Sequence, residues 1–221
     1  MNTDNKAKLG EGVFLVTDVA KILELPLPNV RHWLIEFWNK KFGTEHGKYS
    51  FGDDKNRAVN FLTLIEFIAF AQLRQHGVSA QQIQKFHRAL SKELNTKYPF
   101  AETKLLTDKK NLWYERYNEI VRLDGKKQLT IKKFVAPYLK KIEYDKNMVA
   151  QRYFPLGKSK SVVIDPNHQF GQPTIVGTNI KVKTIYLLYE GDESIENICD
   201  LYDLNHKQVD DAIKYCEKFA A

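Results

Sequence analysis

The stretch from Val162 to Val182, VVIDPNHQFGQPTIVGTNIKV, constrains the fold of this chain more than any other segment. Two extended apolar runs flank a Gly-x-Pro turn and end in Gly-Thr, directly ahead of a segment with helical periodicity. Glycine supplies positive φ in tight turns, proline fixes φ and ends a strand, and threonine before an apolar run suits a strand edge. The pattern predicts a short hairpin that leads into helices.

This order of features resembles the antitoxin-associated family known as domain of unknown function 433. Its pattern runs Ile-x-x-Asp-Pro, Gly-x-Pro and x-x-x-Gly-Thr-x-Ile/Val, followed by three short helices. The matching positions here are Asp165, Pro166, Gly171, Pro173, Gly177, Thr178 and Ile180. The resemblance implies a C-terminal domain over residues 161–221, with a hairpin and a three-helix bundle like a helix-turn-helix. On turn chemistry alone, an ordinary hairpin of a structural domain explains the segment equally well.

Two helical stripes follow Thr184. Ser194 is the expected N-cap of SIENICDLY, and Asn205 with Gln208 forms the expected capping box of NHKQVDDAIKYCEKF. The apolar positions of the two stripes are Ile195, Ile198, Cys199 and Tyr202, then Val209, Ala212, Ile213 and Cys216. The two cysteines take equivalent core positions and have no ligand partners at metal-binding spacing, so we expect buried thiols.

The net charge of +7 is unevenly distributed along the chain. Residues 101–160 contain 15 Lys and Arg against seven Asp and Glu, whereas residues 161–221 contain five against ten. A basic portion attracts a polyanion and an acidic tail repels one. Nucleic acid is therefore expected to meet the first part of the chain and a different partner the last part. A solvated surface without any partner is the alternative.

The N-terminal part has the signals of two short helices. FLVTDVAKIL predicts a helix with Thr17 as its N-cap, and the prolines of ELPLP then end it. The next helix is expected over residues 28–39, burying Val30, Leu34 and Phe37. The other face carries Asn29, Arg31, His32 and Trp33. Two helices joined in this way are the helix-turn-helix plan, in which the second helix enters the major groove.

A wing is predicted after Gly43, because KYSF and AVNF bracket the turn GDDKNR. A long apolar helix, LTLIEFIAFAQLRQHG, follows, and Ser79 caps the next one. With Val30-Arg31-His32-Trp33 in the second helix and Leu73-Arg74-Gln75-His76-Gly77-Val78-Ser79 after the wing, residues 12–97 resemble the MerR-like winged helix-turn-helix. Glu24 replaces the turn glycine of that family, so a longer turn is expected. The family's metal-binding cysteines are absent after the wing.

The resemblance implies that Arg31, His32 and Trp33, together with Arg57 of the wing, contact the DNA backbone. Asn29 is the candidate for a base edge, because an amide can pair with adenine in two places. The full set of candidate DNA-binding residues is Thr17, Asn29, Arg31, His32, Trp33, Lys48, Tyr49 and Arg57. Core packing is the alternative for Trp33, and it is the expected role of Trp38.

Residues 101–156 predict a small, strand-rich middle region. The segments KLLTDKKNLWYE, EIVRLDGKKQLTI and IEYDKNMVAQRYF alternate and are broken by Asp-Lys or Asp-Gly, as antiparallel strands with tight turns are. FVAPYLKKI between them predicts one helix, and residues 157–161 a flexible linker. The fold class expected for the whole chain is α+β and mainly helical.

The sequence offers no convincing active site. It contains no phosphate-binding loop and no Gly-x-Ser-x-Gly, and no histidine has another His or Cys at ligand spacing. A structural turn is favoured over chemistry for Asp165 and His168. We therefore expect no enzyme activity, metal or cofactor. No apolar run reaches the length of a membrane span, and the first residues lack the apolar core of a signal peptide, so a cytoplasmic protein is expected.

Together these features resemble a VapB-like type II antitoxin with a MerR-like head. The resemblance implies that the chain binds operator DNA to repress its own operon. It also implies a cognate toxin as partner, a PIN-like ribonuclease, in a homodimer or a larger hetero-oligomer. The alternative is a stand-alone MerR-like regulator with a small-ligand pocket lined by Trp113, Tyr114 and Tyr117.

Overall fold

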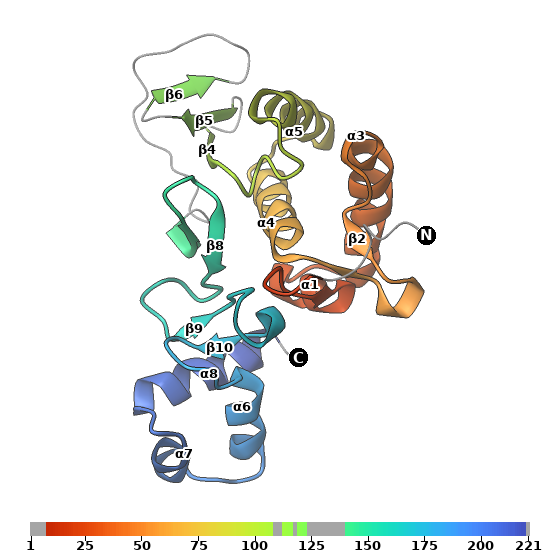
Figure 1. Ribbon diagram of the computed structural model, residues 1–221. Coiled ribbons are helices and arrows are strands. Elements are labelled where there is room, and N and C mark those ends of the chain that lie inside the picture. The colour runs from red at the N-terminus through yellow and green to blue at the C-terminus, as the bar shows by residue number, and fades with distance from the viewer. Residues whose placement is uncertain (1–7, 108–111, 117–118, 123–139, 220–221) are drawn as a thin grey trace.

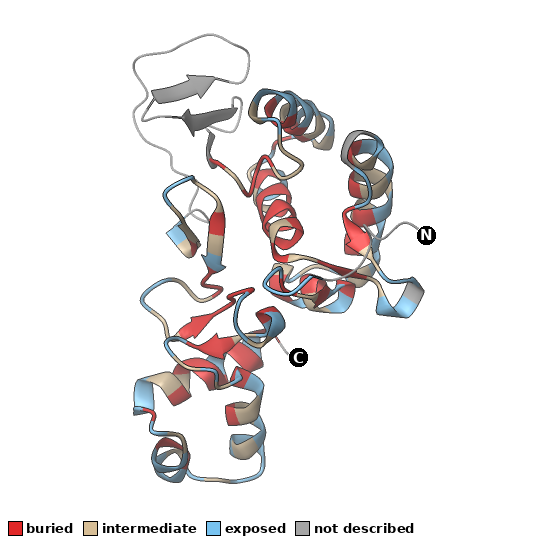
Figure 2. Ribbon diagram, in the orientation of Figure 1, coloured by how far each residue is buried: buried red, intermediate tan, exposed pale blue. Residues whose placement is uncertain are grey.

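The computed structural model describes residues 8–107, 112–116, 119–122 and 140–219, and within these the fold is a mixed α+β arrangement dominated by helices (Figure 1). The strands form small antiparallel sheets of two or three strands each. This is the fold class that the sequence predicts. Buried residues gather in two cores, one through α4 and one where the last hairpin meets α8 (Figure 2).

The first part of the chain forms a compact head. Its opening elements are β1 (Phe14–Leu15), α1 (Val16–Leu23), α2 (Leu27–Trp33), the π-helical η2 (Leu34–Phe42), α3 (Gly43–His46), β2 (Ser50–Phe51), the 3-10 turn η3 (Asp54–Asn56) and β3 (Ala58–Val59). Strand β3 lies in the middle of a three-stranded sheet and pairs antiparallel with both β1 and β2. The wing is therefore anchored to the residues that lead into α1.

Two long helices complete the head. They are α4 (Phe61–Gln75) and α5 (Ala80–Leu94). Asn60 caps α4 by accepting the N–H of Thr63 at 2.9 Å, and Ser79 with Gln82 forms the capping box of α5. Helix α4 is buried on nearly every side, and Phe67 on it stacks on Trp38 with ring centroids 4.2 Å apart. Trp38 is thus a core residue, as predicted.

A buried carboxylate fixes the chain after α5 to α4. Glu66 is fully buried, and one of its oxygens accepts the N–H groups of Phe100 at 2.7 Å and Ala101 at 3.1 Å. Its other oxygen lies 3.0 Å from Nε2 of buried His87 on α5. A buried carboxylate requires polar partners, because burying even a neutral polar group without a hydrogen bond costs roughly 2–7 kcal/mol and an ionised carboxylate costs more.

The described part of the middle region contains antiparallel strands, as predicted, whereas residues 123–131 of the predicted segment EIVRLDGKKQLTI lie outside the described residues. A three-stranded antiparallel sheet comprises β4 (Lys104–Thr107), β5 (Leu112–Arg116) and β6 (Glu119–Arg122), and a separate hairpin comprises β7 (Ile142–Tyr144) and β8 (Ala150–Tyr153). The hairpin joins the core of the head through Ile142, Ala150 and Tyr153. The helix predicted for FVAPYLKKI falls mostly outside the described residues, and its last residue, Ile142, begins β7.

The tail contains the predicted hairpin and three helices. These are β9 (Val162–Val163), β10 (Thr174–Ile175), α6 (Val182–Glu190), α7 (Ile195–Tyr202) and α8 (His206–Phe219). Ser194 accepts the N–H of Asn197 at 3.2 Å, and Asn205 accepts the N–H of Gln208 at 3.0 Å, which confirms both predicted caps. Cys199 and Cys216 are free, buried thiols in the tail core. Burial raises the pKa of Cys216 to about 11.

The segment before β9 is tied down, so the prediction of a flexible linker over residues 157–161 is wrong. Asp211 on α8 is 1% exposed and accepts the N–H of Ser161 at 2.9 Å. Lys160 pairs with the same carboxylate at 3.1 Å, and Lys207 donates to the carbonyl of Ser159 at 2.8 Å. Burial alone would raise the pKa of Asp211, but the Ser161 N–H and the Lys160 ammonium lower it on balance.

The tail meets the head at the Gly-x-Pro turn. The N–H of Val13, just before β1, donates to the carbonyl of Phe170 at 2.8 Å. Gly171 has φ +84°, and a Cβ placed on it would lie 2.5 Å from Cζ of Phe14. Glycine is therefore needed at this position both for its backbone conformation and for the space that the Phe14 ring occupies. A further contact joins Lys218 of α8 to Glu24 at 2.9 Å.

Replacing Gly171 with alanine is expected to lower the free energy of unfolding by about 2–4 kcal/mol, because the new methyl group must displace Phe14 and the backbone is strained. Gly177 is the matched control, since it has φ +80° but open space around its Cβ position. Gly177→Ala should cost only about 1–2 kcal/mol. Urea unfolding followed by circular dichroism measures both. Equal losses of stability in the two variants would show that the close approach of position 171 to Phe14 does not affect the free energy of unfolding.

Candidate nucleic-acid interface

Helices α1 and α2 are joined by a short turn, not the longer one expected from Glu24. Glu24 adopts the left-handed conformation itself, with φ 54° and ψ 43°, and its N–H donates to the carbonyl of Lys21 at 3.0 Å. A glutamate in this region costs about 1–2 kcal/mol relative to glycine. The turn then needs only residues 24–26 before α2 begins at Leu27.

The second helix, α2 continued by η2, exposes a polar face at the residues that are predicted to contact DNA. Val30 and Leu34 are buried in the head core, whereas Asn29, Arg31 and His32 are exposed. The helix continues without a break through Phe42, beyond the predicted end at Asn39. The polar side chains of its first turns thus project from a helix whose opposite face is packed into the head core.

The wing lies beside this helix and needs a glycine at its tip. Gly52 has φ +70°, and a Cβ there would lie 2.5 Å from the carbonyl oxygen of Asn56. The N–H of Val16, the first residue of α1, donates to the carbonyl of Arg57 at 3.1 Å. This bond holds the end of the wing turn against the start of α1.

A hollow of about 230 Å³ lies between the second helix and the wing. Three cationic side chains line it: Arg31 from the helix and Lys55 and Arg57 from the wing. Its remaining lining is apolar and comes from Val16, Leu34 and Ile35. None of the three cations pairs with a carboxylate among the residues that the structure describes. Their charges are therefore available to an anion.

The sequence missed Lys55, although it named both Arg31 and Arg57. The turn GDDKNR, identified as the wing, contains both Lys55 and Arg57, so the position of Lys55 in this turn is the signal that would have added it to the candidates. Lys48 is exposed but lies outside this hollow, before β2.

Tyr49 does not have the phosphate-binding position predicted for it. Its side chain is 3% exposed, and its hydroxyl donates to the carbonyl of Lys97 at 2.7 Å. Tyr49 lies just before β2, and its ring packs in the head core, where the bond to the Lys97 carbonyl holds it.

Two further predictions for the head are modified by the structure. Thr17 is not the N-cap of α1, because the helix begins at Val16 and Asp18 accepts the N–H of Leu15 at 3.0 Å. Thr17 is nevertheless exposed on the first turn. Trp33 is half-buried and packs edge-on against Phe70 at 4.8 Å, so core packing accounts for much of its surface.

The residues of the signature turn of the tail form hydrogen bonds, ion pairs and packing contacts within the fold. Asp165 is 5% exposed, accepts the N–H of Asn167 at 2.9 Å and pairs with Nε of Arg152 at 2.9 Å and Nδ1 of His168 at 3.2 Å. Pro166 is buried, and Pro173 accepts the N–H of Val182 at its carbonyl.

The Gly177-Thr178 turn, which precedes α6, is likewise held by hydrogen bonds within the fold. Thr178 donates its hydroxyl to the Ile175 carbonyl at 3.0 Å and accepts the N–H of Ile180 at 3.1 Å. The signature residues thus organise the turns of the hairpin, as their residue types suggest.

Within the described ranges, no three His, Cys, Asp or Glu side chains come together as a metal site requires. No helix in those ranges combines the length and apolar character that a membrane span needs. A ligand pocket is predicted around Trp113, Tyr114 and Tyr117: Tyr117 lies outside the described residues, and Trp113 and Tyr114 lie on β5.

The head thus has the geometry of a helix-turn-helix followed by a β-wing, and the tail adds a hairpin with three helices. Residues 162–216 match the family described as protein of unknown function, DUF433. An uncharacterized protein of Mycobacterium tuberculosis, Rv2308, is 40% identical over 58 residues, which is 26% of this chain and 24% of that protein. The match thus spans about a quarter of the length of that relative.

A similar fold is found in the crystal structure of Rv2018 from Mycobacterium tuberculosis. The TM-score is 0.65 at 15% identity, and the likeness covers 90% of this chain and 96% of that one. The arrangement of head, middle and tail is therefore shared over nearly the full length. At this identity the likeness concerns the fold alone.

The buried position of Tyr49 has a testable consequence. Tyr49→Phe is expected to lower the free energy of unfolding by about 1 kcal/mol, because the Lys97 carbonyl loses its hydroxyl donor. Tyr189→Phe is the control, since Tyr189 is 41% exposed, and it should change the stability by less than about 0.5 kcal/mol. Guanidinium unfolding followed by tryptophan fluorescence gives both values. Unchanged stability of the Tyr49→Phe variant would contradict a stabilising role for the hydrogen bond from the Tyr49 hydroxyl to the Lys97 carbonyl.

Proposed function

We propose that this protein is a DNA-binding antitoxin of a type II toxin-antitoxin system, with a MerR-like head that represses its own operon. The observation that carries the proposal is the hollow in which Arg31, Lys55 and Arg57 converge between the second helix and the wing. Three cations that have no carboxylate partner among the described residues, on two elements of a winged helix-turn-helix, suit the phosphates of one DNA backbone.

The second helix adds groups that can reach base edges. Asn29 and His32 are exposed on the first turns of the helix, next to Arg31. Recognition helices insert their N-terminal residues into the major groove, and an asparagine amide pairs with adenine there. The proposed role of Arg31 and Arg57 is positioning, and that of Asn29 is sequence readout.

The tail supports a protein partner and not a second DNA contact. Its exposed surface carries acidic side chains of α7 and of the turns on either side of it: Asp192, Glu196, Asp200 and Asp203. Large apolar side chains are exposed on α7 and on the preceding helix α6, with Leu201 at 66% and Leu187 at 55%. Acidic and apolar groups together suit a basic protein surface, and the acidic groups repel phosphate.

We propose that this partner is the cognate toxin, a small ribonuclease of the PIN-like class. A nuclease that binds RNA needs a cationic surface, which the acidic tail complements. A dimer of the antitoxin would place two heads on a pseudo-palindromic operator, about 34–36 Å apart. The compartment proposed for this activity is the cytoplasm, where operator and toxin are found together.

The DNA contacts can be tested by anisotropy with a labelled duplex from the region upstream of the chain's own gene. Arg31→Ala and Arg57→Ala should each weaken binding by about 1–3 kcal/mol and lower the slope of log K against log salt by about 1. Lys40→Ala is the control, because Lys40 is exposed on the same helical rod but pairs with Glu36 at 2.7 Å. Undiminished affinity in Arg31→Ala would remove the second helix from the interface.

The partner surface can be tested by isolating the tagged chain from its native cells and weighing intact complexes by native mass spectrometry. Leu187→Ala and Leu201→Ala, combined, should weaken the complex by about 2 kcal/mol or more if both are central contacts. Leu9→Ala is the control, since Leu9 is 88% exposed in the head.

The co-isolated protein must cleave RNA once it is separated, and must stop doing so when the antitoxin is added back. A homo-oligomer without any second protein would contradict the antitoxin role and favour a stand-alone regulator.

A further inference from the structure

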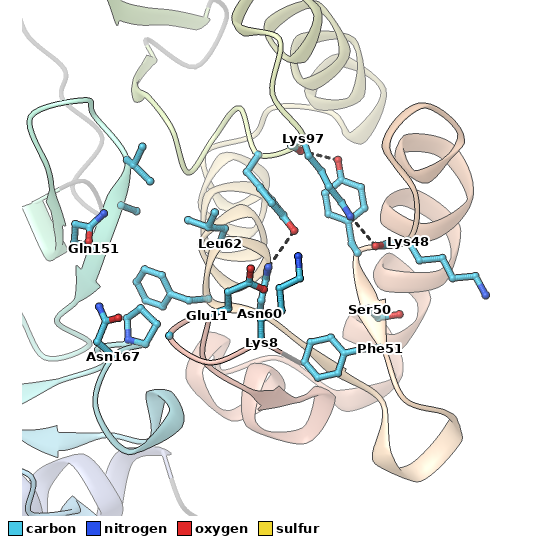
Figure 3. Close-up of a pocket in the computed structure, with 17 residues that line it drawn as sticks. Lys8, Glu11, Lys48, Ser50, Phe51, Asn60, Leu62, Lys97, Gln151 and Asn167 are labelled. Carbon is cyan, nitrogen blue, oxygen red and sulfur yellow. Dashed lines mark hydrogen bonds between the residues drawn. The ribbon is translucent and has the colours of Figure 1, made fainter. Parts of the chain in front are cut away.

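A pocket of about 470 Å³ lies where the head, the β7–β8 hairpin and the tail meet (Figure 3). Its walls come from the N-terminal segment before β1, from β2, from the first turn of α4, from the loop after α5, from β8 and from the signature turn of the tail. This volume falls in the range of small-molecule sites, roughly 300–1,000 Å³. The pocket shares no residue with the hollow at Arg31.

One wall holds a fixed ammonium group. Nζ of Lys97 donates to the carbonyl of Lys48 at 2.7 Å and lies 4.6 Å from the ring centroid of Tyr49 and 5.6 Å from that of Tyr98. Burial lowers the pKa of Lys97, and nearby Glu11 partly offsets this effect. No carboxylate of the described residues forms an ion pair with it. A partly desolvated cation without such a partner favours an anionic ligand.

A second ammonium and a helix N-terminus lie beside it. Figure 3 shows Lys8 reaching up toward Asn60 and Lys97, whereas the side chain of Lys48 points away from them. Asn60 caps α4, whose first turn carries the positive end of the helix dipole. The N–H of Leu62 in that turn has no acceptor among the described residues. These groups add to the charge of Lys97 at one end of the pocket.

The opposite wall is neutral and hydrogen-bonding. Gln151 of β8 and Asn167 of the signature turn lie there, across Leu62 from the two lysines (Figure 3). Their side-chain amides have no hydrogen-bond partner among the described residues. Each amide offers both a donor and an acceptor, so this wall can read the polar edge of a planar group. The Glu11 carboxylate near the lysines can accept from a ligand hydroxyl.

We propose that this pocket binds a small phosphate ester with a planar, hydrogen-bonding body, a class that mononucleotides represent. The phosphate lies between Lys8 and Lys97 at the N-terminus of α4. The sugar hydroxyls face Glu11, and the planar body crosses Leu62 to the amides of Gln151 and Asn167. The proposal does not rest on DNA binding or on a toxin partner, because none of these residues belongs to either surface described above.

The test is isothermal titration calorimetry of the full chain at low salt with the four 5′-mononucleotides and with inorganic phosphate. We expect at least one mononucleotide to bind at one site per chain, and more tightly than inorganic phosphate. Lys97→Met and Lys8→Met should each weaken it about tenfold or more, since each removes a charged hydrogen bond. Lys8 is exposed, so its variant keeps the test open should Lys97→Met disturb the fold.

Two controls separate this pocket from general attraction to a basic protein. Lys92→Met removes an exposed lysine of α5 outside the pocket, and the double variant Arg31→Ala/Arg57→Ala empties the DNA-binding hollow of two charges. Both should keep the affinity for mononucleotides. The proposal is overturned if no mononucleotide binds, if binding survives in both lysine variants of the pocket, or if the arginine double variant abolishes it. Equal affinity for inorganic phosphate would overturn the planar body of the ligand.

Discussion

The contact between Phe14 and the Gly-x-Pro turn joins the two cores of this protein. Phe14 is 1% exposed and begins β1, and its ring occupies the space that any side chain at position 171 would need. The bond from the N–H of Val13 to the carbonyl of Phe170 fixes the same junction through the backbone. Because β1 pairs with β3 of the wing, the signature turn of the tail is one strand away from the wing. Gly171, which in the sequence looks like a simple turn residue, is therefore the position at which the tail packs against Phe14 of the head.

The electrostatic asymmetry of the chain follows the same division. Arg31, Lys55 and Arg57, which form no ion pair within the described part of the chain, line the hollow between helix and wing, while the exposed face of α7 is acidic. The oppositely charged contacts within the molecule, Lys218 with Glu24 and Lys160 with Asp211, are used to hold segments together. Charges separated by more than about 8–10 Å are screened from one another at physiological salt. The charge of each surface therefore acts mainly on a ligand close to it, and under the proposed function the acidic tail is expected to lie away from the phosphates of bound DNA.

Features that depend on neighbours in sequence were predictable. The caps at Ser79, Ser194 and Asn205 rest on hydrogen bonds spanning three residues, and the stripes of the tail helices rest on a period of 3.6. Predictions failed where a distant segment decides the outcome. Tyr49 is buried because the carbonyl of Lys97 accepts its hydroxyl, a contact across 48 positions. The linker at Ser161 is fixed by Asp211, 50 positions away. A local pattern holds no information about such partners, and the pocket assembled from head, hairpin and tail was invisible for the same reason.

The wing sheet is where the three proposed ligands would influence one another. Its central strand β3 consists of Ala58 and Val59, and it pairs with β1 on one side and β2 on the other. The tail holds β1 through Val13 and Phe14, and the pocket is lined by Ser50 and Phe51 of β2. Arg57, which lines the hollow between the second helix and the wing, directly precedes β3. A partner that shifts the tail and a ligand that shifts β2 must therefore act on DNA affinity through the same two-residue strand. Linkage between binding sites is reciprocal. If the tail partner or the pocket ligand changes the affinity for operator DNA by some factor, operator DNA would change the affinity for that partner or ligand by the same factor.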